Sequence, residues 1–485
     1  MKKFSLILVA IVVVGLFLRI YHYQEWFMYS HDQDLLGWFI KDILVNHHIR
    51  LIGQETSQHG VFIGPLFYYL NIPFYLLANW SPLGGNFLVA LLGGFGVWSF
   101  WYVFERIIGK FAAFSGAVFY AVSYSLVLSD REVVPTMPVV IWSVWFLYAV
   151  YLLLNGKQKL GWLLSGLLLG LVWHLNMGLL LISPLVIFAF VLSRKKISVK
   201  PLMAGLFIAF IFALPFILFE VRHGFQQTNA ILFSGLHSEV VTGIEKFDRV
   251  IQLVSKNVYR IFLAEVIPLT HIHSLLITLG IMLFVSFKKI IRFKLSLLMW
   301  LWVVIYMFFF TYNPIVISEY YLNGLNVIWI LFISAFLSFL YHTRWPATAL
   351  VLLSIFVVIN LYRFSGHVVD RSGYIDRKGI IQLIKADAEA NNYPCVSLSY
   401  ITSPGYELGY RYITWRENLK TKAVSDGAPV YTIVFPHSLV DKIDRSVGAL
   451  GLIYPEYDKY TDISLETICS GEDLNTAYPL FGYTE

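Results

Sequence analysis

The chain has 485 residues, of which 58% are hydrophobic and only 14% are charged, and its mean hydropathy is +0.68. A soluble globular protein carries roughly 45–50% apolar and ~25% charged residues, so this composition excludes a soluble enzyme and a disordered chain and predicts a polytopic membrane protein. The net charge of +6 is unevenly distributed, since residues 364–485 hold 11 Lys and Arg against 16 Asp and Glu, whereas the preceding 363 residues hold 25 against 14. The two parts are therefore expected to face different surroundings.

The apolar segments predict about eleven transmembrane helices. A spanning helix needs about 20 mostly apolar residues. Twelve segments of this kind begin near Phe4, Val61, Asn86, Phe111, Met137, Leu160, Gly178, Pro201, His271, Leu295, Leu322 and Trp345. We interpret the first as an uncleaved anchor, because no small-residue cleavage site follows it. The segment at 61–79 contains Gly64, Pro65 and Pro73, which disfavour a spanning helix, so we expect it to dip into the outer face without crossing.

The basic residues indicate the orientation, because cytoplasmic loops carry an excess of Lys and Arg. Lys2 and Lys3 place the N-terminus in the cytoplasm. If 61–79 does not cross, the later basic loops also face the cytoplasm, and the outer side receives loops 20–85, 129–136, 220–269 and 313–321 together with the tail. We therefore predict a multi-pass protein of the cytoplasmic membrane, with a transmembrane domain over 1–363 and a small extracytoplasmic α/β domain over 364–485. The tail contains helical periodicity at 380–390 and strand-like segments at 395–400 and 430–435.

The predicted spans contain little that could drive transport. Spans two to eleven hold no Asp, Glu, Lys or Arg, whereas ion-coupled transporters keep ionisable groups near the bilayer centre. The sequence also has no G-x-x-x-x-G-K-[ST] phosphate loop, which argues against an ATP-driven pump. We therefore expect the chemistry at the outer water–lipid boundary.

The first outer loop begins with the acidic segment Ser30-His31-Asp32-Gln33-Asp34. An apolar stripe follows over 36–44, with Lys41 and Asp42 off the stripe, which predicts an amphipathic helix lying on the membrane. Asp32 has two interpretations: the N-cap of this helix, or a carboxylate that deprotonates an acceptor hydroxyl. Both stay open at this point.

Several stretches of the outer loops resemble a known family. They are Asp32-Gln33, residues 51–57, His59-Gly60, residues 64–69 with Tyr68 and Tyr69, and the supporting stretches 129–135, 173–176 and 219–225. In this order they resemble bacterial membrane glycosyltransferases of the GT-C class, and more narrowly family 39, which is related to protein O-mannosyltransferases and the lipid A aminoarabinose transferase. The resemblance covers residues 1–260 well and the later spans only by topology.

The resemblance implies a GT-C fold and the transfer of a hexosyl or pentosyl group from a polyprenyl-phosphate carrier to a protein, lipid or glycan acceptor. The family's acidic residue in the first outer loop matches Asp32, and Asp34 is a second catalytic candidate, although it stands one position further than in the family. Asp130 and Glu132 match a second family acid only loosely. Asp32 would act as general base in an inverting displacement. The remaining outer-face candidates are Tyr68, Tyr69, His174 and Asn176.

Basic outer residues are the candidates for holding the donor phosphate, because Arg can bind phosphate through two parallel hydrogen bonds. The candidates are His59, Arg131, Arg222 and His223. Arg131 could instead pair with its neighbours Asp130 and Glu132, and Arg222 could contact lipid headgroups. No metal-ligand spacing involves the loop histidines, but a divalent ion beside Asp32 stays an open expectation. No other cofactor and no nucleic-acid partner is expected.

Two further questions stay open. Cys395 and Cys469 could form a disulfide in an oxidising exterior or remain two buried thiols. The competing functions are a polymerase or ligase of lipid-linked glycans, a flippase or other transporter of lipid-linked sugars, and a non-catalytic sensor or scaffold.

Overall fold

The structure, a computed structural model, describes residues 2–56, 58–233, 243–313, 317–460, 465–471 and 473. The chain forms two compact units. The helical unit comprises Met1–Tyr21, Leu51–Phe67 and Leu88–His367, and the mixed unit comprises His22–Arg50, Tyr68–Phe87 and Val368–Glu485. The predicted division at 363/364 differs from this one, because two segments of the first loop fold together with the tail in the mixed unit.

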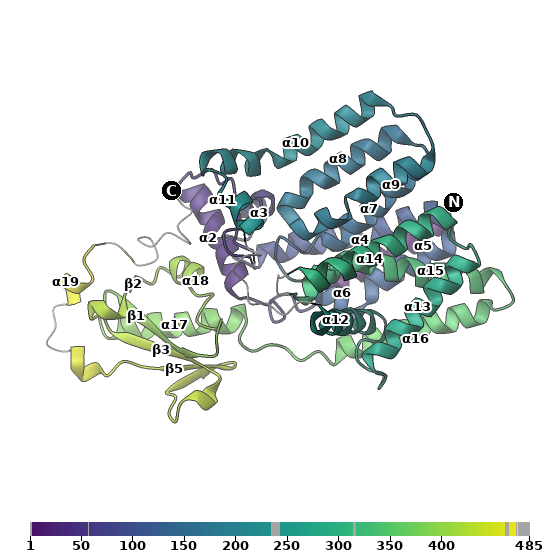
Figure 1. The fold of residues 1–485 in the computed structure, drawn as a ribbon. Coiled ribbons are helices and arrows are strands. Elements are labelled where there is room, and N and C mark those ends of the chain that lie inside the picture. Colours follow the sequence, from purple (N-terminus) through teal and green to yellow (C-terminus); the bar gives the residue numbers. More distant parts are fainter. Residues whose placement is uncertain are drawn as a thin grey trace. The chain divides into compact units, whose positions relative to one another are not determined.

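The helical unit is built of helices (Figure 1), and most of the long ones are apolar. Within it α8 packs against α7 and α10, and α5 packs against α1 and α15. The bounds of its helices are α1 (Lys2–Ile20), most of α4 (Gly84–Ile107), α5 (Lys110–Val122), α6 (Tyr124–Ser129), α7 (Val139–Leu154), α8 (Gln158–Leu175), η1 (Met177–Ile182), α9 (Pro184–Ser193), α10 (Val199–Arg222), α11 (Gln226–Phe233), α12 (Ile244–Leu263), α13 (His271–Phe287), α14 (Phe293–Tyr312), η3 (Glu319–Leu325), α15 (Asn326–His342) and α16 (Pro346–Ser365).

The helices coincide with the predicted apolar segments. The described residues include five helices long and apolar enough to cross a membrane, namely Gly84–Ile107, Val199–Arg222, Phe293–Tyr312, Glu319–His342 and Pro346–Ser365, together with shorter apolar helices at most of the other predicted spans. In the doubtful segment 61–79 the structure has only α3 (Leu66–Leu77), with Pro73 inside it. A helix of 12 residues is about 18 Å long at ~1.5 Å per residue, which is short of the ~30 Å hydrocarbon layer.

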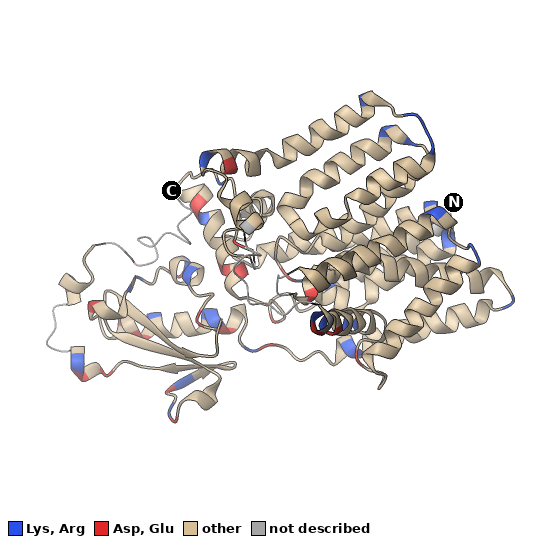
Figure 2. Cartoon of the chain, in the orientation of Figure 1, with Lys and Arg blue, Asp and Glu red and all other residues tan. Residues whose placement is uncertain are grey.

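Charged residues in the helical unit lie mainly at helix ends and in loops, and the middles of the long helices are free of colour in Figure 2. The exception is α12, which carries charged residues along one side and buries Val250, Val254, Val258 and Ile261. The sequence predicted only a loop over 220–269, although the spacing of these four residues is that of a helix face. Residues 234–242 of this loop and 314–316 of the loop at 313–321 lie outside the described residues.

The mixed unit is built around a five-stranded sheet of order β2-β1-β3-β5-β4. β1 runs parallel to β2 and β3, β5 runs antiparallel to β3 and β4, and α17 packs against β4 and β5. The predicted helix and both predicted strands are present. The bounds are α2 (His31–Val45), most of α3, α17 (Tyr374–Ala390), β1 (Val396–Thr402), α18 (Arg411–Arg416), β2 (Thr421–Lys422), η4 (Val424–Asp426), β3 (Val430–Phe435), η5 (His437–Leu439), β4 (Arg445–Val447), β5 (Leu450–Ile453), η6 (Tyr457–Tyr460) and α19 (Leu465–Ile468).

A disulfide joins Cys395, which precedes β1, to Cys469, which follows α19, with 5.6 Å between the two Cα atoms. Both cysteines are buried against Ala428. This is one of the two alternatives that the sequence left open. It closes a segment of 74 residues, and a cross-link of that length stabilises a fold by about 4 kcal/mol through the entropy of the unfolded chain.

Candidate functional site

The start of α2 is fixed by Ser30. Ser30 is the N-cap residue, and the Oε1 of Gln33 accepts hydrogen bonds from its backbone N–H at 2.9 Å and from its hydroxyl at 3.0 Å. The interpretation of Asp32 as the N-cap is therefore wrong. Asp32 lies in the first turn of the helix, and its side chain is half-buried.

Asp34 is a buried part of the framework. Its Oδ1 accepts a hydrogen bond from the Tyr29 hydroxyl at 2.8 Å and another from the backbone N–H of Tyr412 at 2.9 Å. Burial raises the pKa of the Asp34 carboxyl above its usual value of 3.8, and the two hydrogen bonds oppose that shift. Because Tyr412 belongs to α18, Asp34 ties α2 to the tail of the chain inside the mixed unit.

Residues 33–42 of α2 are buried, contrary to the predicted surface helix. Lys41 and Asp42, which lie off the apolar stripe, are only 5% and 4% exposed. Gly37 permits this packing, because a Cβ atom there would lie 2.6 Å from the ring of Tyr412. The apolar stripe of α2 is therefore not its only buried side, since α18 packs against the helix within the same unit.

Asp42 is the centre of an ionic network at the end of α2. Its Oδ2 contacts the guanidinium of Arg50 at 2.8 Å and Nδ1 of His48 at 2.9 Å. Tyr69, an outer-face candidate from the sequence, accepts a hydrogen bond from the backbone N–H of Arg50 and donates one to its carbonyl. Tyr68, the second such candidate, is 1% exposed and packs on Phe39. Both tyrosines thus hold the mixed unit together.

The structure adds a cationic pair that the sequence did not reveal. Lys41 of α2 and Arg411 of α18 each lie 4.8 Å from the centroid of the Trp38 ring. Burial lowers the pKa of both groups, and Arg411 lowers that of Lys41 further. The sequence could not reveal the pair, because 370 residues separate its two members. Trp38 and Lys41 alone have an ordinary helical spacing that indicates no site.

In the helical unit, Asp130 pairs with a cation from α1. Its Oδ2 accepts hydrogen bonds from Nε of Arg19 at 2.9 Å and from Nη2 at 2.5 Å, and both side chains are buried. Arg131 donates to the carbonyls of Leu18 and Arg19 at the end of α1, and burial lowers its pKa to about 10. Of the two local partners predicted for Arg131, Asp130 instead binds Arg19. Glu132 is half-buried.

The residues after α10 divide into anchored and exposed groups. Glu220 is buried and accepts hydrogen bonds from the backbone N–H groups of Gln227 and Thr228 and from the Thr228 hydroxyl, so it holds the start of α11. His223 stacks on Phe219, and its Nδ1 lies 2.8 Å from the Phe219 carbonyl oxygen. Arg222 is exposed.

The remaining candidates of the helical unit have different surroundings. His59 is 97% exposed and lies 2.9 Å from Glu55. His174 is buried, with Nε2 donating to the Phe212 carbonyl at 2.8 Å. Gly64 allows this placement, because a Cβ atom there would lie 2.3 Å from the His174 ring. The absence of a side chain at this glycine therefore makes room for His174. Asn176 caps η1 through the backbone N–H of Gly178.

The candidates thus fall into two sets. The mixed unit contains Asp32, Asp34, Tyr68 and Tyr69, and the helical unit contains His59, Arg131, Glu132, His174, Asn176, Arg222 and His223. Within the part of the chain that the structure describes, no three His, Cys, Asp or Glu side chains gather as a group that could hold a metal ion.

The chain is similar to a known protein family and to solved structures. A family model described as dolichyl-phosphate-mannose-protein mannosyltransferase matches residues 63–219. The crystal structure of ArnT from Cupriavidus metallidurans bound to undecaprenyl phosphate is similar to 93% of this chain over 98% of its own, with a TM-score of 0.61 and 11% identity. The apo form of that protein gives a TM-score of 0.61 and 11% identity over 94% of this chain and 99% of its own. No curated protein matches the sequence.

These likenesses confirm the GT-C resemblance and the polytopic helical fold predicted from the sequence. At 11% identity the solved structures establish the fold, and the family match over 63–219 adds the type of enzyme. Taken together, the fold shared with ArnT and the matched segment indicate that the protein is a multi-pass membrane glycosyltransferase.

Proposed function

We propose that the protein transfers a sugar from a polyprenyl-phosphate donor to an acceptor hydroxyl at the outer face of the cytoplasmic membrane, with Asp32 as general base. The donor class is supported by the family match and by the undecaprenyl phosphate bound to the similar ArnT. The outer location is supported by the basic inner loops and by the disulfide in the mixed unit, since disulfides persist in oxidising compartments.

We assign the base from the different surroundings of Asp32 and Asp34 in the first turn of α2. The carboxylate of Asp34 is buried and engaged by Tyr29 and Tyr412, and the cap is supplied by Ser30 and Gln33. Asp32 keeps exposed surface on this fixed scaffold. A general base has to reach the proton of a substrate while its own element stays rigid. We therefore assign the chemistry to Asp32 and give Asp34 a structural role.

The proposed step is a single displacement. Asp32 takes the proton of the acceptor hydroxyl, whose oxygen attacks the anomeric carbon of the donor sugar. The bond between that carbon and the phosphate oxygen breaks, so the polyprenyl phosphate leaves with the electron pair and the anomeric configuration inverts. Cations stabilise the charge that develops on the leaving phosphate.

Three cations are the best candidates for the phosphate. Arg222 is exposed, and within the described residues its guanidinium makes no hydrogen bond or ion pair. Lys41 and Arg411 lie on the same Trp38 ring in the unit that contains Asp32. Arg131 and His223 are less suited, because their nitrogen atoms already contact backbone carbonyls. His59 is also less suited, because it lies beside an acidic residue, Glu55.

The proposal is tested by reconstituting the purified protein in liposomes with a radiolabelled polyprenyl-phosphate sugar. We expect sugar to leave the carrier in step with the release of polyprenyl phosphate, and the product to have the opposite anomeric configuration. Movement of intact donor across the bilayer without release of polyprenyl phosphate would contradict the proposal and favour a flippase. Retention of the anomeric configuration would contradict the single displacement.

A further inference from the structure

The mixed unit contains a polar pocket that the proposed reaction does not use. Its volume is about 420 Å³, within the range of roughly 300–1,000 Å³ for small-molecule sites. It is lined by the turn after α3, by α17, and by the end of α18 with the residues that follow. The lining residues are Asn79, Trp80, Lys378, Trp415, Arg416, Glu417 and Asn418.

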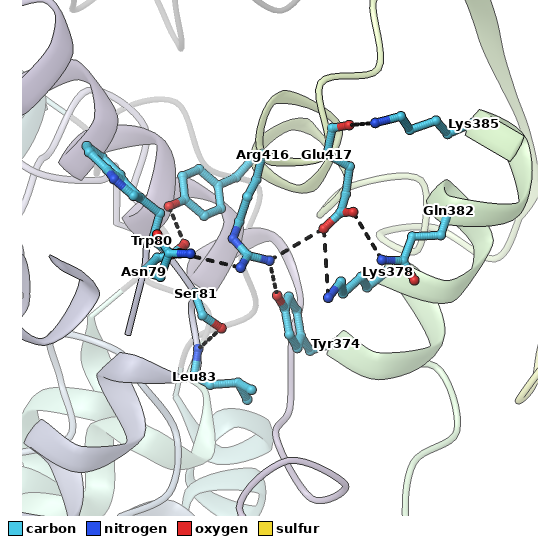
Figure 3. Close-up of polar contacts among 11 residues, drawn as sticks. Asn79, Trp80, Ser81, Leu83, Tyr374, Lys378, Gln382, Lys385, Arg416 and Glu417 are labelled. Atoms are coloured by element: carbon cyan, nitrogen blue, oxygen red, sulfur yellow. Dashed lines mark hydrogen bonds and ion pairs between the residues drawn. The ribbon is translucent and has the colours of Figure 1, made fainter. Parts of the chain in front are cut away.

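The charged side of the pocket is held in place by a network (Figure 3). The guanidinium of Arg416 donates to the Tyr374 hydroxyl at 3.0 Å, to Oε1 of Glu417 at 3.4 Å and to the carbonyl of Asn79 at 3.4 Å. Glu417 also accepts a hydrogen bond from Gln382 at 3.1 Å and lies 3.9 Å from Nζ of Lys378. These contacts orient a guanidinium, a carboxylate and an ammonium group around one opening.

The other side of the pocket carries uncommitted groups. Trp80 and Trp415 are half-buried and meet edge to face, with 5.6 Å between their ring centroids. Asn79 and Asn418 are exposed. Among the described residues, no hydrogen bond involves the two indole N–H groups or the two side-chain amides, so these donors and acceptors are available to a ligand.

The backbone presents these side chains in an uncommon conformation. The φ angles of Asn79, Trp80 and Asn418 are 50°, 61° and 54°. Positive φ is uncommon for residues other than glycine and is a clear outlier for a bulky residue such as tryptophan. Residues held in such conformations cost about 1–3 kcal/mol each and cluster at functional sites. Asn commonly adopts positive φ just after a helix, as Asn79 and Asn418 do after α3 and α18, so the outlier in the pocket is Trp80.

We infer that this pocket binds a saccharide of the acceptor, an inference that rests on the proposed function. The apolar C–H face of a sugar ring matches an indole face. Its hydroxyls can donate to a carboxylate, accept from a guanidinium, and do both with a side-chain amide. Two cations against one carboxylate leave an excess positive charge, which suits a neutral or acidic sugar better than a basic one. The acceptor is thereby assigned to a glycan-bearing molecule.

Binding is tested without turnover, on the full-length protein in nanodiscs, by saturation-transfer NMR with maltose, cellobiose, mannobiose and diacetylchitobiose. We expect at least one disaccharide to bind at millimolar concentration and Trp415→Ala to raise its Kd at least tenfold. Because Trp415 also packs on Tyr412, the milder Asn418→Gly is a second variant, for which we expect a rise of about threefold to tenfold from one lost hydrogen bond.

The matched control is Asn392→Gly, since Asn392 has a φ of 55° and does not line the pocket. It should bind like the wild type. Absence of binding by the wild type, or equal Kd values in the wild type and Asn418→Gly, would overturn the inference whether or not the protein proves to be a polyprenyl-phosphate-dependent transferase.

A kinetic measurement tests whether the saccharide bound in the pocket belongs to the acceptor or to the donor. In the transfer assay, Asn418→Gly should raise the KM for the acceptor by about threefold to tenfold and leave the KM for the donor unchanged. A raised donor KM with an unchanged acceptor KM would overturn the assignment to the acceptor. Asp32→Asn should lose turnover and keep disaccharide binding, so a failure of the proposed base is distinguishable from a failure of the pocket.

Discussion

Asp130 in the helical unit and Asp34 in the mixed unit are almost equally buried, at 2% and 5% exposure, but their partners differ in kind. Asp130 faces the guanidinium of Arg19 through two hydrogen bonds on one oxygen. Asp34 faces two neutral donors, the Tyr29 hydroxyl and the Tyr412 N–H, again on one oxygen. An amide can serve neutral donors as well as a carboxylate does, whereas it cannot neutralise a buried cation.

The two acids differ in how the surrounding structure accommodates a buried carboxylate. The buried guanidinium of Arg19 is met by an opposite charge, because an unpaired ion is expensive to remove from water. In the mixed unit a buried carboxylate can serve as a hydrogen-bond hub that fixes α2 to α18. Replacing each acid by its amide, which keeps shape and removes charge, tests this difference residue by residue.

The largest effect on stability is expected at Asp130. Asp130→Asn leaves the buried guanidinium of Arg19 without a counter-charge, so we expect the free energy of unfolding to fall by about 3–5 kcal/mol. Denaturant titration in detergent, followed by circular dichroism, measures it. The control is Glu55→Gln, because Glu55 pairs with the exposed His59 and such pairs contribute about 0–1 kcal/mol. Equal losses in the two variants would contradict the account.

A smaller loss of stability is expected at Glu220. This variant tests whether the loss depends on the kind of partner or on the unit in which the acid lies. Glu220 is in the helical unit but has neutral partners, and its two oxygens both accept hydrogen bonds, from Gln227 and Thr228. In Glu220→Gln the amide NH2 group must face at least one N–H or O–H donor, so we expect a loss of about 1–3 kcal/mol. The same titration measures it. A loss as large as that of Asp130→Asn would show that location, and not the partner, decides.

The smallest loss is expected at Asp34, because both of its donors contact Oδ1 alone. In Asp34→Asn the amide oxygen can accept both hydrogen bonds, so we expect a change within about 1 kcal/mol. Asp34→Ala removes the acceptor for two buried donors and should cost about 1–3 kcal/mol, again by denaturant titration. An Asn variant as unstable as the Ala variant would mean that the charge itself stabilises the mixed unit.

The pH dependence of stability tests the effect of the Asp34 charge separately. Burial raises the folded-state pKa of Asp34 above 3.8, so the folded protein binds this proton more tightly than the unfolded chain does. The stability from Asp34 is therefore fully present below its ordinary pKa and is lost as pH rises through the raised value. Asp34→Asn lacks this titration, so its stability relative to the wild type should improve from about pH 4 upward and then level off. A difference that does not change with pH, measured by titrations at several pH values, would contradict the raised pKa.

The sequence predicts the helices well because each apolar segment carries its own evidence of length and hydropathy. It also places Asp32 and Asp34 at the start of a helix. It could not separate their roles, because the partner that buries Asp34 lies 378 residues further along the chain. For the same reason the Arg19–Asp130 pair, 111 residues apart, and the Trp80–Trp415 pocket were not foreseen. Long-range pairing is set by tertiary packing, which no local pattern records.

The loop over 220–269 shows a different kind of failure. The sequence does contain the helical spacing of Val250, Val254 and Val258, but the charged residues between them made the segment look like a solvated loop. Amphipathic periodicity, rather than mean hydropathy, is the signal that finds α12.

In the proposed mechanism Asp32 performs the chemistry while Asp34 holds the framework, and one assay compares the two residues directly. Transfer from a polyprenyl-phosphate sugar is measured for Asp32→Asn and Asp34→Asn, the same substitution two residues apart on one helix turn, in protein shown by circular dichroism to be folded. Loss of a general base lowers the rate by about 10²–10⁴. We predict a loss of that size for Asp32→Asn and a rate within about threefold of the wild type for Asp34→Asn. A wild-type rate for Asp32→Asn would contradict the account.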